Sequence, residues 1–189
     1  MRIELVIQGT GGQGALTAGQ FLIEAGLREG RCVSLVPYYT PEVRGGEANA
    51  MVVLSDAPIG SVLPAEWDVA VLMAERSAAR LALQVKPGGL IVYNSTLVGR
   101  PRTRDGVSVI GIPASEIAEQ TGNVRVANMV LLGALCAQWN HVSTDSLKTA
   151  IRATFTGLKE RFVVVNLAAV DAGIQALEQA CAGPLAGHA

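Results

Sequence analysis

The chain has 189 residues, of which 50% are hydrophobic and 16% are charged, and its formal net charge is -1 at pH 7. This length suits a single α/β domain. The near-neutral charge and the lack of Lys or Arg runs argue against a protein that binds nucleic acid or anionic membranes. So little charge cannot cover a monomer's surface well. We therefore expect partner subunits to bury part of it, the alternative being a core filled with Ala, Val and Leu.

The N-terminal residues run directly into an expected strand, in place of the basic and apolar regions of a signal peptide. The longest apolar stretch, 126–139, is shorter than the roughly 20 residues that span a bilayer. We therefore expect a cytoplasmic protein that makes no membrane contact.

The cysteines at positions 32, 136 and 181 lie far apart and outside any CxxC pattern. They are expected to be small buried hydrophobic residues, and they predict no metal site in this chain alone. Two histidines, His141 and His188, form no recognisable grouping with a nucleophile. The sequence thus predicts no catalytic residue and no metal ligand in the isolated chain.

A glycine-rich loop follows the first expected strand, 3–7, and precedes a helix that begins near Ala15. The loop residues that we propose for cofactor binding are Gly9, Gly11, Gly12, Gln13 and Gly14. Glycine accepts positive φ and lets backbone N–H groups approach a phosphate. Two interpretations stay open: the loop holds a phosphate, or it makes a tight strand-to-helix turn that packs against something.

Gly9, Gly11 and Gly14 match the G-x-G-x-x-G pattern of dinucleotide-binding proteins. The acidic residue that would bind the ribose should fall near Pro37, but the first later carboxylate is Glu42. This absence counts against NAD, and the loop also lacks the lysine of a P-loop. The Gln13 amide is expected either to bond to a ligand or subunit, or to be solvated on the turn.

The next elements are a helix over 15–27 with small residues that let it lie close to a sheet, and a second, largely buried strand over 32–36, parallel to the first. A stiff loop follows. We propose its residues as an interface because Tyr and Arg are enriched at binding hot spots: Tyr38, Tyr39, Pro41, Glu42, Arg44, Gly45 and Gly46. The alternative is an ordinary surface ion pair between Glu42 and Arg44.

The remaining pattern predicts a three-layer αβα, doubly wound, Rossmann-like and mostly parallel sheet in one domain, 1–183, with a flexible tail at 184–189. A run that is apolar nearly all round, 126–139, predicts a helix buried against the sheet and another helix or a partner. The other expected strands are 48–54, 68–73, 90–93 and 107–110. The other expected helices are 75–85, 113–120 and 158–182, together with one that begins at Ser143 or Thr144. The first of these ends at the Lys-Pro-Gly-Gly segment 86–89.

Four motifs in this order resemble the gamma subunit of 2-oxoacid:ferredoxin oxidoreductases. They are the glycine loop 9–14, the Pro-Glu-Val-Arg-Gly-Gly segment 41–46 after two tyrosines, the segment 55–61, and Asn128-Met129-Val130 ahead of Leu132-Gly133-Ala134. The resemblance covers nearly the whole chain. The P-E-x-R-G-G-x-A-N form is most similar to the 2-oxoglutarate (KorC-like) branch.

The resemblance implies a complex that oxidatively decarboxylates a 2-oxoacid, forms acyl-coenzyme A and reduces ferredoxin. It implies alpha, beta and ferredoxin-like delta partners, and thiamine diphosphate with Mg and an iron–sulfur cluster on those other chains. It also implies that the loops 9–14 and 38–47 face these partners or line the approach of coenzyme A. The isolated chain is expected to be inactive and able to homodimerise. Two alternatives remain: a self-sufficient nucleotide-binding oxidoreductase, and a purely structural partner with an unoccupied loop.

Overall fold

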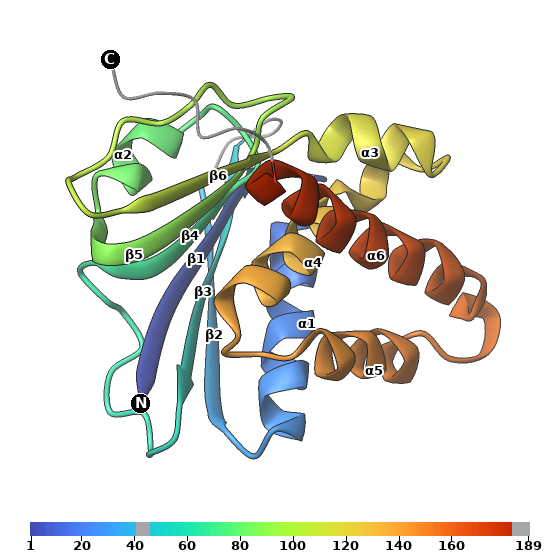
Figure 1. The fold of residues 1–189 in the computed structure, drawn as a ribbon. Coiled ribbons are helices and arrows are strands. Elements are labelled where there is room, and N and C mark those ends of the chain that lie inside the picture. Colours follow the sequence, from blue (N-terminus) through green and yellow to red (C-terminus); the bar gives the residue numbers. More distant parts are fainter. Residues whose placement is uncertain (41–45, 183–189) are drawn as a thin grey trace.

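A six-stranded sheet in the order β2-β3-β1-β4-β5-β6 forms the middle of the molecule (Figure 1). The computed structural model describes residues 1–40 and 46–182. The strands are β1 (Arg2–Thr10), β2 (Cys32–Tyr39), β3 (Glu47–Ser55), β4 (Trp67–Leu72), β5 (Val85–Asn94) and β6 (Ser108–Ile112).

The sheet is mixed because β3 runs against its neighbours. β1, β4, β5 and β6 pair with one another in parallel, whereas β3 pairs antiparallel with both β1 and β2. β2 therefore points the same way as β1, as the sequence predicts, although β3 lies between them. The carboxyl ends of β1, β4, β5 and β6 meet at one edge, which is where open α/β sheets collect ligands.

Helices cover both faces of the sheet, but unequally. Figure 1 shows α1, α4, α5 and α6 on one face and the short α2 on the other. The helices are α1 (Ala15–Arg28), α2 (Ala78–Ala82), α3 (Ala114–Gln120), α4 (Ala127–Trp139), α5 (Thr144–Thr154) and α6 (Arg161–Ala182), with 3-10 turns at Val124–Val126 and Gly157–Lys159. The predicted α/β class with helices on both sides is confirmed, although the second helical layer is thin.

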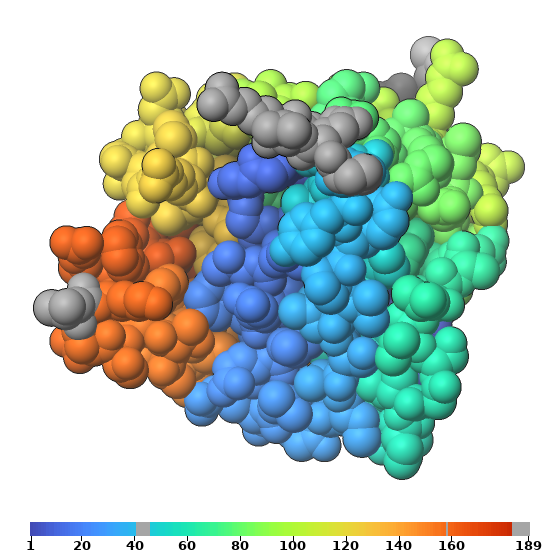
Figure 2. Space-filling model, turned by 180° about the vertical axis from the view of Figure 1, so that it is seen from behind, coloured from blue at the N-terminus to red at the C-terminus, as the bar shows by residue number. Residues whose placement is uncertain are grey.

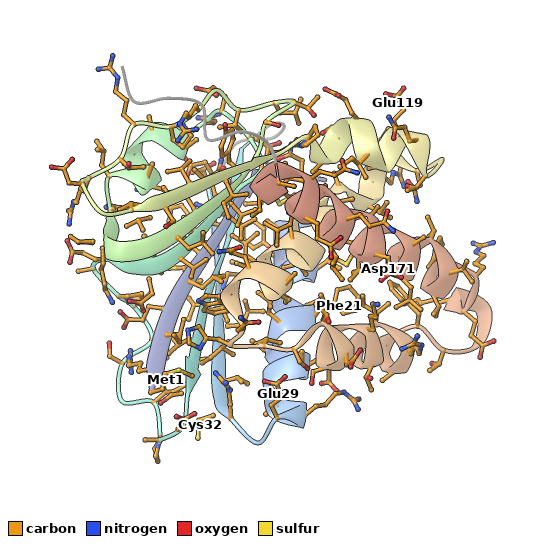
Figure 3. The ribbon with its side chains drawn as sticks, viewed as in Figure 1. Met1, Phe21, Glu29, Cys32, Glu119 and Asp171 are labelled. Atoms are coloured by element: carbon orange, nitrogen blue, oxygen red, sulfur yellow. The ribbon has the colours of Figure 1, made fainter. Side chains whose placement is uncertain are left out.

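Small residues bring α1 close to β2 and β3, as the sequence predicts. A Cβ added at Gly19 would lie 2.8 Å from the Ala50 Cβ, and one at Gly26 would lie 2.9 Å from the Leu54 Cδ2. Further out on α1, the Phe21 side chain faces α5 (Figure 3), and its ring centroid lies 5.7 Å from that of Phe155. The main apolar core lies between this face of the sheet and the helices.

α4 is buried along nearly its whole length, which confirms the interpretation of the apolar run. Every residue from Asn128 to Cys136 is buried. The α4–α6 contact is backbone to backbone, because a Cβ at Gly133 would collide with the Val170 carbonyl and one at Gly173 with the Val130 carbonyl. The helix that packs on α4 belongs to the same chain.

Three local expectations are wrong. β2 is an edge strand, half-buried to exposed, because β3 takes the place beside β1. The helix expected over 75–85 has five residues, α2, because Val85 already pairs with Trp67 and the segment 86–89 belongs to β5. Cys32, which is labelled in Figure 3, and Cys181 are exposed. Of the three cysteines only Cys136 is buried, and this burial raises the pKa of its thiol to about 12.

Candidate functional site

The glycine loop, residues 9–14, joins the carboxyl end of β1 to α1 at the edge where β4 and β5 also end (Figure 1). Gly12 and Gly14 have φ values of 94° and 78°, in the left-handed region that favours glycine. The Gln13 N–H donates to the Thr10 carbonyl across 3.1 Å and closes the turn. The loop is therefore a tight strand-to-helix turn, and phosphate binding stays a prediction.

The loop's glycines serve two different purposes. A Cβ at Gly9 would lie 3.1 Å from Gln13 Oε1, and one at Gly14 would lie 2.5 Å from Asn128 Nδ2, so these two positions are filled by packing. Gly11 and Gly12 are exposed, and within the described residues nothing lies within 4 Å of a Cβ at either. The open side of the loop is thus at Gly11 and Gly12.

The Gln13 side chain holds the loop together from inside. Its Oε1 accepts a hydrogen bond from the Thr10 N–H at 2.8 Å, and its Nε2 donates to the Met73 carbonyl at 3.3 Å. In this arrangement both ends of the amide bond to the backbone of the same chain. It fastens the loop to the segment that follows β4.

The N-terminus of α1 is left uncapped by side chains in the described part of the chain, and its first turn contains no acidic residue. Such a helix end carries a partial positive charge and N–H groups that α-helical bonding does not use. Next to the open side of the loop, it is chemically suited to an anion such as a phosphate.

The two loops singled out in the sequence meet in space. The Gly11 N–H donates to the Gly46 carbonyl at 3.1 Å, and Gly46 is buried. Two hydrogen bonds join Thr40 and Glu47: the Thr40 N–H donates to the Glu47 carbonyl at 3.2 Å, and the Glu47 N–H donates to Thr40 Oγ1 at 2.8 Å.

Glu47 is the centre of a polar group that we call the Glu47 cluster: Glu47, Asn49, Ser77 and Arg80. The Ser77 hydroxyl donates to the Glu47 carboxylate, Asn49 Nδ2 lies 3.2 Å from it, and Arg80 Nη2 lies 3.5 Å from it. Ser77 has a φ of 65°, which is uncommon for a residue with a side chain. The cluster fixes the start of β3 to the start of α2.

Gln8, fully buried in β1, fixes the segment after β4 from the other side. Its Oε1 accepts from the Ala74 N–H at 3.3 Å, its Nε2 donates to the Arg76 carbonyl, and its own carbonyl accepts from the Met73 N–H at 2.9 Å. The segment after β4 is thus held by the side-chain amides of both Gln8 and Gln13.

A pocket of about 200 Å³ lies beside the loop, between the end of β5 and the turn Val124–Val126. Asn94 is buried in its wall and ties β5 to α3 by donating from Nδ2 to Ser115 Oγ at 2.8 Å. The lining residues are Gly12, Gln13, Met73, Asn94, Leu97, Ser115, Val124, Arg125 and Ala127. Arg125 contributes a cationic residue to a lining that also includes Gly12 and Gln13 of the glycine loop.

Of the predicted interface residues, Tyr38 and Tyr39 lie exposed at the end of β2, and Gly46 lies against the glycine loop. Pro41, Glu42, Arg44 and Gly45 lie outside the described residues. The sequence reasoning did not single out Gln8, Ser77 or Arg125. Gln8 carried a signal, because it is a polar residue between the expected strand 3–7 and the glycine loop.

Within residues 1–40 and 46–182, no group of three or more His, Cys, Asp or Glu side chains comes together in a way that would hold a metal ion. No helix in those ranges is both long and apolar enough to cross a bilayer.

Residues 4–176 match the model of the pyruvate ferredoxin/flavodoxin oxidoreductase family. The chain belongs to this family. It is 37% identical over 174 residues to ketoisovalerate oxidoreductase subunit VorA of Methanothermobacter thermautotrophicus. The matched region covers 92% of this chain and 36% of VorA. It is 33% identical over 154 residues to 2-oxoglutarate synthase subunit KorC of Methanocaldococcus jannaschii, with 80% and 82% covered. The chain thus spans about a third of the length of VorA and most of the length of KorC.

Two solved structures have the same fold. One is the gamma subunit of a keto/oxoacid ferredoxin oxidoreductase from Geobacter sulfurreducens, with 26% identity, a TM-score of 0.80, and 94% of this chain and 99% of that one covered. The other is 2-oxoglutarate:ferredoxin oxidoreductase from Magnetococcus marinus with 2-oxoglutarate, coenzyme A and succinyl-CoA bound, with 27% identity and a TM-score of 0.84. It matches 94% of this chain and 31% of that chain. Within the family, the present chain corresponds along its length to the gamma subunits.

Proposed function

We propose that this chain is the gamma subunit of a cytoplasmic 2-oxoacid:ferredoxin oxidoreductase, which converts a 2-oxoacid and coenzyme A to acyl-coenzyme A and CO2 while it reduces ferredoxin. The observation that carries the proposal is the match to a free-standing gamma subunit over 94% of this chain and 99% of that one.

The proposal places thiamine diphosphate with its Mg²⁺, and the iron–sulfur cluster, on alpha, beta or delta partner subunits. Thiamine diphosphate supplies the carbanion chemistry that decarboxylation needs. This chain contributes its fold, its subunit contacts and the glycine loop. Ferredoxin is the proposed electron acceptor of the assembled complex.

Two substrates are candidates. The Pro-Glu-Val-Arg-Gly-Gly segment favours 2-oxoglutarate, and so does the similarity to KorC. The higher identity to VorA supports ketoisovalerate. Both are 2-oxoacids that would yield an acyl-coenzyme A. Because they differ in charge, a comparison of the reaction rates with the two compounds distinguishes between these candidates.

Within this function, we propose that the open side of the glycine loop holds a phosphate of coenzyme A. Gly11 and Gly12 leave room beside the backbone, the α1 N-terminus is uncapped, and Arg125 lies in the adjoining pocket. A related complex has been solved with coenzyme A bound. The attraction between the helix dipole and a phosphate is worth about 0.3–1 kcal/mol at an exposed site, so the loop would assist binding without dominating it.

Co-expression of the chain with the alpha and beta subunits of the same organism tests the proposal. We expect the three to co-purify and to reduce ferredoxin when 2-oxoacid and coenzyme A are both present. Rates with 2-oxoglutarate, ketoisovalerate and pyruvate then identify the substrate. Failure to co-purify, with a chain that is folded by circular dichroism, would contradict the proposal.

A further inference from the structure

One residue before α2 has a backbone conformation that its type rarely adopts. Ser77 has a φ of 65° and a ψ of -7°, in the left-handed region, where a side chain crowds the backbone. Among the described residues other than glycine, only Asn140 also has a positive φ. Asn140 follows the last residue of α4, and asparagine is a known choice for this conformation at a helix end. The position of Ser77 at the start of a helix offers no such explanation.

Ser77 also lacks the usual role of a serine that precedes a helix. Such a serine normally has an extended backbone, and its oxygen accepts an N–H of the first helical turn. Ser77 makes no capping bond of this kind with α2, and its hydroxyl donates instead to the carboxylate of Glu47, 30 residues away in the sequence. Rare backbone conformations persist where surrounding contacts impose them, and they are concentrated at functional sites. The contact with Glu47 accounts for the conformation of Ser77, whereas α2 does not.

Glu47 lies where a displacement would reach the glycine loop. It is opposite Thr10 in the antiparallel register of β1 and β3. The hydrogen bond from the Gly11 N–H to the Gly46 carbonyl, at 3.1 Å, continues this register by one residue. The Glu47 side chain is only 12% exposed, and a carboxylate with so little access to water depends on its partners in the protein. A change at Ser77 is therefore transmitted to Gly11 through two adjacent residues.

The segment 73–77 also contacts the glycine loop directly. The Met73 carbonyl accepts a hydrogen bond from Gln13 Nε2 at 3.3 Å. The segment thus reaches the loop at two points, at Gln13 directly and at Gly11 through residues 46–47. Gly11 is exposed, and within the described residues nothing lies within 4 Å of a Cβ built on it. Because packing does not hold this side of the loop, hydrogen bonds have to hold it.

We propose that Ser77 is a positioning residue for the glycine loop, and that it acts through Glu47 and Gly46 on Gly11. Its effect on coenzyme A rests on the proposed function, in which a phosphate binds at the open side of the loop. Its effect on the conformation of the loop is independent of that function. Each effect therefore has its own measurement.

The variant Ser77→Gly separates positioning from the strain of the backbone. Glycine adopts a positive φ readily, so this substitution relieves the backbone while it removes the hydroxyl that Glu47 accepts from. The matched control is Asn140→Gly, which gives the same relief at the other positive φ, at an exposed position after α4. Thermal unfolding by circular dichroism verifies that both variants are folded.

Amide hydrogen exchange of the isotope-labelled full chain, followed by NMR, reports the conformation of the loop. The loop leads into α1, which Figure 2 shows beside β2 on the outer surface of the molecule. Water therefore reaches the exposed Gly11 N–H whenever its bond to Gly46 opens. We expect exchange at Gly11 to be about three- to tenfold faster in Ser77→Gly, as for the loss of about one hydrogen bond, and unchanged in Asn140→Gly.

Steady-state ferredoxin reduction by the assembled complex reports the effect on coenzyme A. Ser77→Gly should raise the KM for coenzyme A by about three- to tenfold with kcat near that of the wild type, and Asn140→Gly should change neither. Wild-type exchange at Gly11 in Ser77→Gly overturns the inference, and so does an equal change in Asn140→Gly. Faster exchange with an unchanged KM supports the positioning of the loop and contradicts the phosphate site in the proposed function.

Discussion

Asn128, near the start of α4, donates a hydrogen bond from Nδ2 to the Gly14 carbonyl across 3.0 Å, and its amide fills the space that a side chain at Gly14 would need. Two motifs that are 114 residues apart in the sequence are thus one unit in the fold. α4 supports the glycine loop from behind, and the Asn128 Oδ1 accepts from the Met129 N–H. The conformation of the loop therefore depends on the buried helix.

Asn128→Ala should destabilise the protein by about 1–3 kcal/mol, because it leaves the Gly14 carbonyl without this partner and creates a gap beside the loop. Urea unfolding at pH 7 measures the change. Gln20→Ala, at an exposed position in α1, is the control and should change the free energy of unfolding by less than about 0.5 kcal/mol. Equal stability of the two variants would show that Asn128 does not support the loop.

Gly11→Asp should raise the KM for coenzyme A in the assembled complex with little change in kcat. Two unit charges about 4 Å apart repel by about 1 kcal/mol in water, which corresponds to about a fivefold increase. Gly11 does not have a positive φ and its Cβ position is open, so the substitution introduces no backbone strain.

Gly11→Asn is the matched variant, because it has the same shape without the charge, and it should keep a KM near that of the wild type. If both variants behave like the wild type while the complex stays assembled, the loop does not contact a phosphate of coenzyme A. The assay is steady-state ferredoxin reduction at varied coenzyme A.

Gly173→Ala should destabilise the protein by about 1–3 kcal/mol through overpacking at the α4–α6 contact, where a Cβ would meet the Val130 carbonyl. At an ordinary helix position the same substitution stabilises by up to about 1 kcal/mol, so the sign of the change is diagnostic. Thermal unfolding by circular dichroism gives that sign. An increase in Tm would mean that α4 and α6 are not in backbone contact.

The Glu4 carboxylate should make stability depend on pH in the acid range. Burial raises its pKa, but hydrogen bonds from Lys86 Nζ at 2.9 Å and Arg2 Nε at 3.0 Å outweigh burial and lower the pKa below its usual value. The stabilisation is therefore fully present above the unfolded pKa of about 4.3, and it is lost as the pH falls through the lower folded pKa.

Glu4→Gln should remove this part of the pH dependence, so that its unfolding free energy falls less steeply than the wild type's below about pH 4.5. Glu178→Gln, at an exposed position of α6, is the comparison and should retain the wild-type slope. Chemical unfolding at several pH values between 3 and 7 provides the measurement. Parallel curves for Glu4→Gln and the wild type would contradict the assignment.

The sequence predicted the elements that depend on local residue patterns. Its predictions were wrong where contacts between distant segments decide the structure. The turn at Gly12 and Gly14 and the burial of α4 follow from glycine chemistry and from an apolar run without a polar face. The insertion of β3 between β1 and β2 is tertiary, so the exposed position of β2 could not be inferred from its apolar residues. The positive φ of Ser77 and the inward position of the Gln13 amide also depend on neighbours that no local pattern reveals.

The most direct measurement of the central claim is an add-back assay. Alpha and beta subunits of the complex, purified without this chain, are supplied with 2-oxoacid, coenzyme A and ferredoxin, and ferredoxin reduction is recorded before and after the chain is added. We predict that addition of the chain raises a low rate to saturation at a fixed stoichiometry, and that the gain requires coenzyme A. An unchanged rate, with alpha and beta fully active on their own, would contradict its role as the gamma subunit.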